Sequence, residues 1–276
     1  MKVLFWNTGK QKIDGLLSQL STEKLIDLIV LAEYDDINNN FLAIANNEAE
    51  LFNEVPQIGC KRIKLFLRSG IVNVEHGPET NYYTAKKFIF SNLFSILMVA
   101  LHLPSKLYQN ESTQTLEAVE FKREIETAES ELLTNNTFII GDFNMNPFER
   151  GMVSASAFHS VPCRIIARKE QRVIKQRSHK YFYNPMWNLF GDFDNSPGTF
   201  FYNSTEQAVY YWNILDQVIL RPSMIKYFEK DSLNIIQKIG ETSLITDSGR
   251  PNLSDHLPIT FEFNFQGEIA NEKFVA

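Results

Sequence analysis

Polar residues recur at the points where apolar runs of this sequence stop. Carboxylate and amide oxygens are hard ligands that suit Mg²⁺, and histidine can move a proton or donate a hydrogen bond to an anion. A charge buried at a strand end is costly unless it is paired or bound to a metal. Together these residue types predict a site for metal-assisted hydrolysis of a phosphodiester or phosphomonoester. The eight candidates are Asn7, Glu33, His102, Asp142, Asn144, Asp216, Asp255 and His256.

The stretch FIIGDFNMNP, Phe138–Pro147, contains two of these candidates and could also be a simple turn, because Gly, Asp and Asn are common turn residues. In a strand, a spacing of two places Asp142 and Asn144 on one face and Phe143 on the other. The neighbouring candidates Asp255 and His256 would point to opposite sides of an ideal strand. We therefore expect the chain to bend before them.

The apolar patterns predict mixed strands and helices over the full length. The run Arg62–Arg68 and the run Ile71–Glu75 are expected to form a hairpin around Ser69-Gly70. The clearest helix is Thr113–Leu133, with Leu116, Val119, Ile125, Ala128 and Leu132 at nearly helical spacing. Strands are further expected at Val3–Trp6, Asp27–Ala32, Lys87–Phe90, Phe94–Leu101, Phe138–Ile140 and Leu257–Phe265, and within Tyr210–Leu220.

No repeat or linker divides the chain, which indicates one α/β domain over residues 1–265 and a flexible polar tail over residues 266–276. The strands do not alternate regularly with helices, so a doubly wound sheet is disfavoured. Two packed sheets with helices outside suit the pattern better.

Composition limits the function classes. The 276 residues are 44% hydrophobic and carry a net charge of −6, which argues against a general nucleic-acid coating protein but allows a local basic patch. Two cysteines, Cys60 and Cys163, do not suggest a disulfide scaffold, and we expect two buried thiols. No signal peptide and no transmembrane segment is recognisable, so a cytoplasmic protein is the simplest expectation.

Six segments together resemble the endonuclease/exonuclease/phosphatase superfamily, which has the deoxyribonuclease-I-like fold. They occur in the order of that family and cover residues 3–263. The resemblance implies a four-layer αββα sandwich of two mixed β-sheets flanked by helices. The segments are LFWNTGK, LIVLAEYDD, VALHLPS, IIGDFNMNP, ILDQVIL and LSDHLPI.

The resemblance also implies roles for the eight candidates, with Mg²⁺ or Mn²⁺ as the cofactor. Glu33 would be the main metal ligand, with Asn7 and Asp255 beside it. Asp142 would orient or deprotonate the attacking water, and Asn144 would hold that water or the phosphate. His256, fixed by Asp216, and His102 would contact phosphate oxygens. A histidine at position 102 leans away from the abasic-site repair nucleases, which resemble one another in carrying tyrosine there.

Two features depart from the family or extend beyond its motifs. Asp35 and Asp36 follow Glu33 where some members carry a basic residue, and they either weaken contact with a polyanion or form a solvated turn. The segment 164–180 is strongly basic and aromatic residues follow it, as in nucleic-acid contact surfaces, although a solvated surface would look the same. Its candidate substrate contacts are Arg164, Arg168, Lys169, Arg172, Lys175 and Arg177.

These observations favour a nuclease that acts on DNA or RNA, so that nucleic acid is the expected partner. Phosphatase or phospholipase-type phosphodiesterase activity on inositol phosphates or sphingomyelin-like lipids is the alternative. The intact set of candidates counts against a catalytically inactive binding module.

Overall fold

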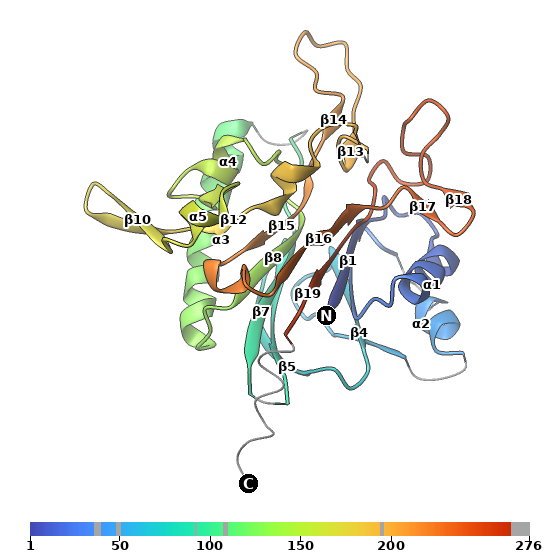
Figure 1. The fold of residues 1–276 in the computed structure, drawn as a ribbon, viewed down its shortest axis with the longest axis horizontal. Coiled ribbons are helices and arrows are strands. Elements are labelled where there is room, and N and C mark those ends of the chain that lie inside the picture. Colours follow the sequence, from blue (N-terminus) through green and yellow to red (C-terminus); the bar gives the residue numbers. More distant parts are fainter. Residues whose placement is uncertain (36–39, 48–50, 92, 107–109, 194–195, 266–276) are drawn as a thin grey trace.

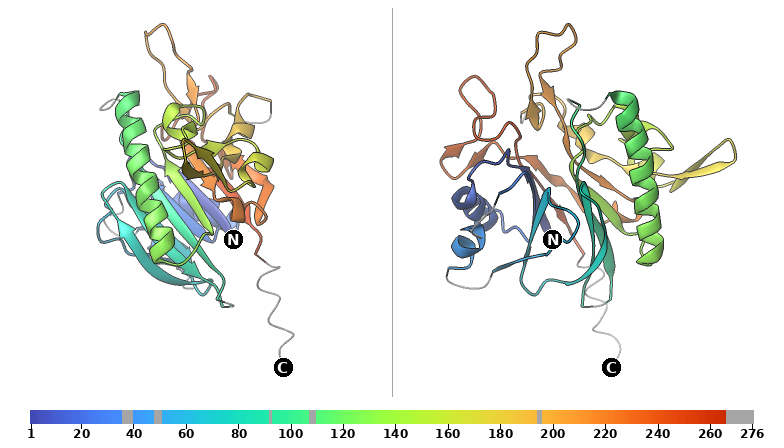
Figure 2. Two further views of the ribbon diagram at one scale, coloured as in Figure 1. Left: turned by 90° about the vertical axis from the view of Figure 1, so that its left-hand side faces the viewer. Right: turned by 180° about the vertical axis from the view of Figure 1, so that it is seen from behind.

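Two β-sheets lie face to face in the protein, with helices on their outer faces (Figures 1 and 2). This computed structural model describes residues 1–35, 40–47, 51–91, 93–106, 110–193 and 196–265. The helices α1 and α2 lie beside the first sheet, and the long helix α3 crosses the outer face of the second. The four-layer sandwich predicted from the sequence is thereby confirmed, while the expected tail 266–276 lies outside the described residues.

The first sheet joins the two ends of the chain. Strand β1 pairs in parallel with β2 and antiparallel with β19, so residues near position 3 and near position 261 are neighbours. The run LIVLA of β2 is buried along its whole length, which explains why it is continuously apolar. In spatial order the strands are β16 (Phe228–Ile235), β19 (Ile259–Phe263), β1 (Lys2–Asn7), β2 (Leu28–Ala32), β4 (Ile63–Arg68) and β3 (Phe52–Glu54).

The second sheet is buried on both faces at its centre. In its strand β8, Phe138 and Ile140 belong to the core that the two sheets share, while Ile139 packs in a second core beneath α3. In spatial order the strands are β5 (Asn73–Glu79), β6 (Tyr83–Ile89), β7 (Ser95–His102), β8 (Thr137–Asp142), β15 (Asp216–Leu220), β12 (Phe182–Tyr183) and β9 (Ser160–Val161).

The hairpin expected around Ser69-Gly70 does not form. Strand β4 pairs with β2 and β3 in the first sheet, whereas β5 pairs with β6 in the second. The turn is therefore a crossover between the two sheets, which local turn residues do not distinguish from a hairpin.

Helix α3 covers Glu111–Glu131, close to its predicted bounds, and it buries most of the predicted face: Ile125 and Ala128 are in the core beneath it, and Val119 and Leu132 pack against that core. The side chain of Asn110 caps the helix by accepting a hydrogen bond from the backbone N–H of Thr113 at 2.9 Å. Phe121 packs against Tyr83 and Phe158, with ring centroids 4.8 and 5.5 Å apart, whereas Leu116 of the expected stripe is 66% exposed. The apolar residues of the buried face are Ala118, Phe121, Ile125 and Ala128.

The remaining elements are short. Three two-stranded ribbons lie outside the sheets, and the loop between β13 and β14 projects beyond the ends of both sheets (Figure 1). No helix in the described part of the chain is long and apolar enough to cross a membrane. The ribbons are β10 (Gln171–Ile174) with β11 (Arg177–Lys180), β13 (Phe200–Phe201) with β14 (Trp212–Asn213), and β17 (Lys238–Ile239) with β18 (Thr242–Ser243). The other α-helices are α1 (Asp14–Glu23), α2 (Asn40–Ala45), α4 (Arg150–Val153) and α5 (Arg164–Ala167). The 3₁₀ turns are η1 (Pro185–Leu189) and η2 (Pro222–Met224).

Candidate active site

Three candidate residues form a row across neighbouring strands of the second sheet. His102 ends β7, Asp142 ends β8 and Asp216 begins β15. In the registers of these strands Asp142 is the direct partner of both His102 and Asp216. Residues in register across a sheet point to the same face, so strand pairing alone brings these three side chains together.

Asp142 lies at the centre of the cluster and is only 2% exposed. Its carboxylate accepts a hydrogen bond from Nδ2 of Asn7 at 3.1 Å and from the backbone N–H of Asn144 at 2.8 Å. Burial raises the pKa of this carboxyl, and the nearby His256 and the two hydrogen bonds oppose that shift. Asn7 comes from β1, so Asp142 joins the polar ends of the two sheets.

His256 and Asp216 form a buried pair. Nδ1 of His256 lies 2.8 and 3.0 Å from the two carboxylate oxygens of Asp216, and its Nε2 lies 3.9 Å from Oδ2 of Asp142. Burial alone would lower the pKa of His256, but the charge and hydrogen bond of Asp216, with Asp142, raise it to about 9. The imidazole is therefore charged at neutral pH.

His102 faces the cluster in the opposite protonation state. Its Nε2 lies 3.6 Å from Oε1 of Glu33 and 3.7 Å from Oδ2 of Asp142. Burial lowers the pKa of His102 to about 4, although the charge of Glu33 opposes the shift. Its buried Nδ1 has no hydrogen-bond partner among the described residues. A neutral His102 and a charged His256 thus flank Asp142.

Backbone geometry presents Glu33 at the edge of this cluster. Its φ of 49° is left-handed, and its carbonyl accepts hydrogen bonds from the Thr8 hydroxyl at 2.6 Å and the Lys10 N–H at 2.9 Å. This conformation turns the chain away from β2 and leaves the Glu33 side chain 37% exposed. Asp35 is exposed as well, and Asp36 lies outside the described residues.

Ser254 connects the C-terminal motif to Asn7. Its hydroxyl donates to the carbonyl of Asn7 at 2.8 Å, accepts from the backbone N–H of His256 at 3.1 Å and lies 3.5 Å from Oδ1 of Asp255. The expected bend before Asp255 and His256 is present, and the hydrogen bonds of the Ser254 hydroxyl stabilise it. Asp255 is exposed and His256 is buried, so the two side chains diverge.

The donor chemistry fits a hard cation at the exposed side of the cluster. Glu33 and Asp255 offer accessible carboxylates, and Asn7 offers an amide oxygen. Ligand atoms of the buried trio Asp142, Asp216 and His256 also lie within 4.8 Å of one another. That trio suits proton and hydrogen-bond chemistry better, because a protonated imidazole has no free lone pair for a metal.

Asn144 lies at the site, but for a different reason than its spacing suggested. Strand β8 ends at Asp142, and Asn144 has a left-handed φ of 52° in the turn that follows. Its Nδ2 donates to the Leu103 carbonyl at 2.8 Å. Phe143 does point into packing, with its ring centroid 5.1 Å from that of Phe158. The turn and the catalytic interpretation of this stretch are therefore compatible.

The predicted basic contacts do not lie beside the catalytic cluster. Their segment is held by Lys180, which pairs with Glu129 at 3.4 Å, and by Arg221, which donates to the Tyr181 carbonyl at 3.2 Å. Arg221 follows the last residue of β15, whereas Asp216 begins that strand, so the two ends are about 16 Å apart. The ribbon β10–β11 projects sideways from the molecule (Figure 1). Substrate contact by Arg164, Arg168, Lys169, Arg172, Lys175 and Arg177 stays a prediction.

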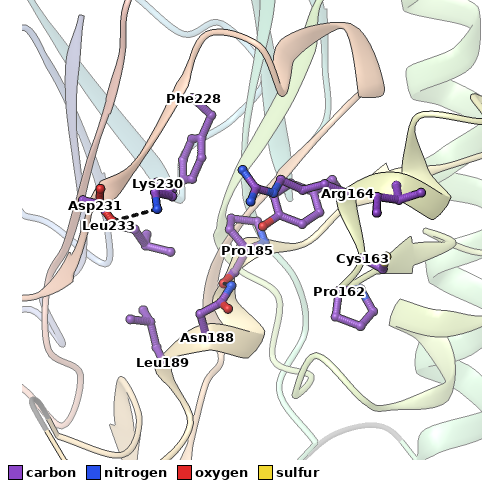
Figure 3. A pocket seen from close by; sticks show the side chains of 12 residues that line it. Pro162, Cys163, Arg164, Pro185, Asn188, Leu189, Phe228, Lys230, Asp231 and Leu233 are labelled. Atoms are coloured by element: carbon purple, nitrogen blue, oxygen red, sulfur yellow. Dashed lines mark hydrogen bonds and ion pairs between the residues drawn. The ribbon is translucent and has the colours of Figure 1, made fainter.

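Arg164 instead lines a cavity of about 550 Å³ between β16 and the segment that carries α5, β12 and η1 (Figure 3). None of the eight candidates lines it. Cys163 is also part of its wall and is only half-buried, so the expectation of two buried thiols is wrong for this residue. Both cysteines are free thiols.

Sequence reasoning missed three residues that support the site. Thr199 accepts hydrogen bonds from the backbone N–H groups of Leu215 and Asp216 at 3.2 and 3.1 Å, and no sequence signal indicates this. Phe200 packs its ring 4.6 Å from that of His256. Ser254 could have been found, because a serine two residues before a turn residue often bonds its backbone N–H.

The two-sheet sandwich is shared with solved structures of other proteins. The fold is that of the endonuclease/exonuclease/phosphatase superfamily. A protein of this family from Leptotrichia buccalis C-1013-b is similar with a TM-score of 0.58 at 13% identity, covering 96% of this chain and 100% of that one. D. rerio TDP2 complexed with single strand DNA product has a TM-score of 0.56 at 16% identity, covering 96% and 98%.

The catalytic domain of human Nocturnin with bound sulfate is similar at a TM-score of 0.55 and 13% identity, covering 96% of this chain and 93% of that one. No family model and no curated protein matches the sequence. At such identities the similarity establishes the fold, and function must be argued from this chain's own residues.

Proposed function

We propose that this protein is a Mg²⁺-dependent phosphodiester hydrolase and, within that class, a nuclease acting on DNA or RNA. One observation carries the proposal. A charged His256, fixed by Asp216, lies 3.9 Å from Asp142, whose carboxylate is held by Asn7 beside the exposed Glu33. This arrangement offers a proton acceptor, a cationic hydrogen-bond donor and metal ligands around one point.

Glu33, with Asp255 and Asn7, would hold Mg²⁺ or Mn²⁺, which neutralises negative charge on the phosphate oxygens when bound. Asp142 suits the orientation and deprotonation of water, because its raised pKa makes it a better proton acceptor than an ordinary aspartate. His256 donates an N–H to a phosphate oxygen from its Nε2, while Nδ1 donates to Asp216. His102 and Asn144 contact the phosphate or the water from the other side.

The nuclease preference is supported by the kinds of protein that have a similar structure. One neighbour is TDP2 with a single strand DNA product, and another is the endonuclease domain of the TRAS1 retrotransposon. The basic segment 164–180, which includes the ribbon β10–β11, is kept in the proposal as an accessory surface for substrates long enough to reach it. Its residues are Arg164, Arg168, Lys169, Arg172, Lys175 and Arg177. A cytoplasmic location is also part of the proposal and is tested by cell fractionation.

A substrate panel tests the proposal. Purified protein is incubated with Mg²⁺ or Mn²⁺ and with single- and double-stranded DNA and RNA, inositol phosphates, phosphoinositides and sphingomyelin. We expect cleavage of a nucleic acid that stops when EDTA is added. Robust hydrolysis of an inositol phosphate or lipid without any cleavage of nucleic acid would contradict the nuclease assignment and favour the phosphatase or phospholipase alternative. Inactivity on the whole panel would indicate a binding module.

A further inference from the structure

One pocket adjoins the catalytic cluster, and a second pocket shares the side chain of Lys106 with it. The nearer has a volume of about 320 Å³ and is lined by Asn144, Phe200, Tyr202 and Lys106, among others. The second, of about 710 Å³, is open and includes Lys106 and Tyr210. Tyr202 and Tyr210, one in each lining, come from the segment between β13 and β14. This segment projects from one end of the sandwich (Figure 1).

The nearer pocket presents flat rings next to the reacting groups. Phe200 packs its ring 4.6 Å from that of His256. The rings of Phe200 and Tyr202 are nearly parallel, with 11° between their planes and 6.4 Å between their centroids. Tyr202 is 49% exposed, so part of the residue is accessible to a ligand. Asn144 closes this pocket on the side of Asp142.

The second pocket also combines aromatic rings with cations, and none of the eight catalytic candidates lines it. Phe148 and Tyr210 contact each other with ring centroids 5.5 Å apart, and they are 37% and 69% exposed. Arg150 also lines this pocket. Lys106 lies between the two pockets, where an ion pair with Glu149 holds its side chain. Glu149 in turn accepts hydrogen bonds from Asn146 at 3.0 and 3.1 Å, so the cation is anchored to the turn after β8.

We propose that these pockets bind two successive bases of a single-stranded nucleic acid beside the cleaved phosphodiester, with Tyr202 stacking on the nearer base and Tyr210 on the next. This inference rests on the proposed function and narrows its substrate class. Exposed rings that alternate with cations match the repeat of bases and phosphates along a single strand. In a duplex the base faces are already stacked on one another, so they cannot occupy such pockets without melting.

Abasic substitution separates base stacking from phosphate binding. Cleavage of fluorescent single-stranded oligonucleotides is compared with cleavage of the same strands carrying single tetrahydrofuran abasic units at each position around the cleavage site. Tyr202→Ala and Tyr210→Ala should each lower kcat/KM on the intact strand about 5- to 150-fold, the factor expected for losing one base stack. They should leave unchanged the rate on a strand that lacks the base they contact.

Matched variants control the test. Phe193→Ala removes an aromatic side chain that is 99% exposed and is absent from the described linings of both pockets, so it should not alter either rate. Tyr202→Trp retains a stacking ring and should restore cleavage of the intact strand. Parallel assays on DNA and RNA of one sequence show which strand the pockets prefer.

The outcomes distinguish this inference from the proposed function. Equal cleavage of intact and abasic strands by the wild-type protein, or equal losses on both in the tyrosine variants, overturns the base pockets while the hydrolase stands. Fluorescence anisotropy in EDTA measures binding without catalysis. Base-dependent binding that the variants lose, without cleavage of any phosphodiester, overturns the proposed function and keeps the pockets. Equal binding of intact and abasic strands, without cleavage, overturns both.

Discussion

Nδ1 of His256 lies 2.8 Å from Oδ2 of Asp216, and both side chains are buried at the end of the second sheet. The carboxylate outweighs the cost of burying the imidazolium and raises the pKa of His256 to about 9. The pair thereby places a positively charged hydrogen-bond donor, Nε2 of His256, 3.9 Å from Oδ2 of Asp142. His102, whose pKa burial lowers to about 4, stays neutral on the other side.

The rate should therefore fall at alkaline pH. If His256 must be protonated, kcat/KM is constant at neutral pH and declines as pH rises through about 9. Asp216→Asn removes the charge that raises the pKa of His256, so the decline should move to lower pH. A pH–rate profile of both proteins checks this. An alkaline decline at the same pH in both would show that His256 is not the titrating group.

Pairing of Glu129 with Arg221 should be needed for stability. Arg221 donates to the two carboxylate oxygens of Glu129 at 2.7 and 3.1 Å, and both side chains are nearly inaccessible to solvent. Glu129→Gln leaves a buried guanidinium with Glu126, at 3.4 Å, as its nearest remaining carboxylate. We expect a loss of about 3 kcal/mol in the free energy of unfolding, measured by urea denaturation.

The control for this prediction is Glu131→Gln, which alters an exposed residue two positions farther along α3 and should change stability by less than about 0.5 kcal/mol. Similar unfolding midpoints for the two variants would show that the buried pair contributes nothing.

Gly141 should be irreplaceable for a steric reason. A Cβ at this position would lie 1.9 Å from the carbonyl oxygen of Leu101 on the neighbouring strand. Gly141→Ala should destabilise the protein by about 3 kcal/mol or more, because the central strands would have to separate. The control is Gly15→Ala in α1, where a Cβ meets nothing within 4 Å, and it should be neutral or slightly stabilising. Thermal unfolding of both variants measures the difference. Equal melting temperatures for both variants would contradict the account.

The basic segment 164–180 should matter only for long substrates. Because its base lies about 16 Å from the catalytic cluster, a short oligonucleotide cannot reach both. Replacing Arg168, Arg172 and Lys175 with alanine should weaken binding of a long strand and flatten its salt dependence, while cleavage of a dinucleotide is unchanged. Binding titrations at several salt concentrations check this. An unchanged salt slope on the long strand would leave the segment without a substrate role.

Strand ends were the informative part of the sequence. Apolar runs of β7 and β8 that stop at His102 and Asp142 predicted where polar side chains gather, because parallel strands present their ends at one edge. The fold followed from the same pattern. Glu33 and Asn144 were recognised as candidates from their residue types. Their left-handed backbone conformations, which orient the side chains, could not be predicted from the sequence pattern.

Long-range placement was beyond the sequence. The basic segment 164–180 follows the turn at Asp142 and Asn144 in the sequence. Its neighbours β9 and β12 nevertheless pair near Leu220, at the far end of β15. Charge density alone does not show at which end of a sheet a segment docks. On α3 most of the expected stripe is buried, but Leu116 is exposed, and Phe121 was missed because Tyr83 and Phe158 from distant parts of the chain bury it.

The central claim is most directly tested by the Mg²⁺ dependence of single-strand cleavage in the wild-type protein and in Glu33→Gln. The amide keeps the size of the side chain and removes its charge, so the fold should persist, as circular dichroism and the unfolding midpoint would show. The account predicts saturable activation of the wild type by Mg²⁺, loss of activity in EDTA, and a rate at least about 100-fold lower for Glu33→Gln at all Mg²⁺ concentrations. Cleavage that survives EDTA, or a Glu33→Gln protein with wild-type activity, would contradict it.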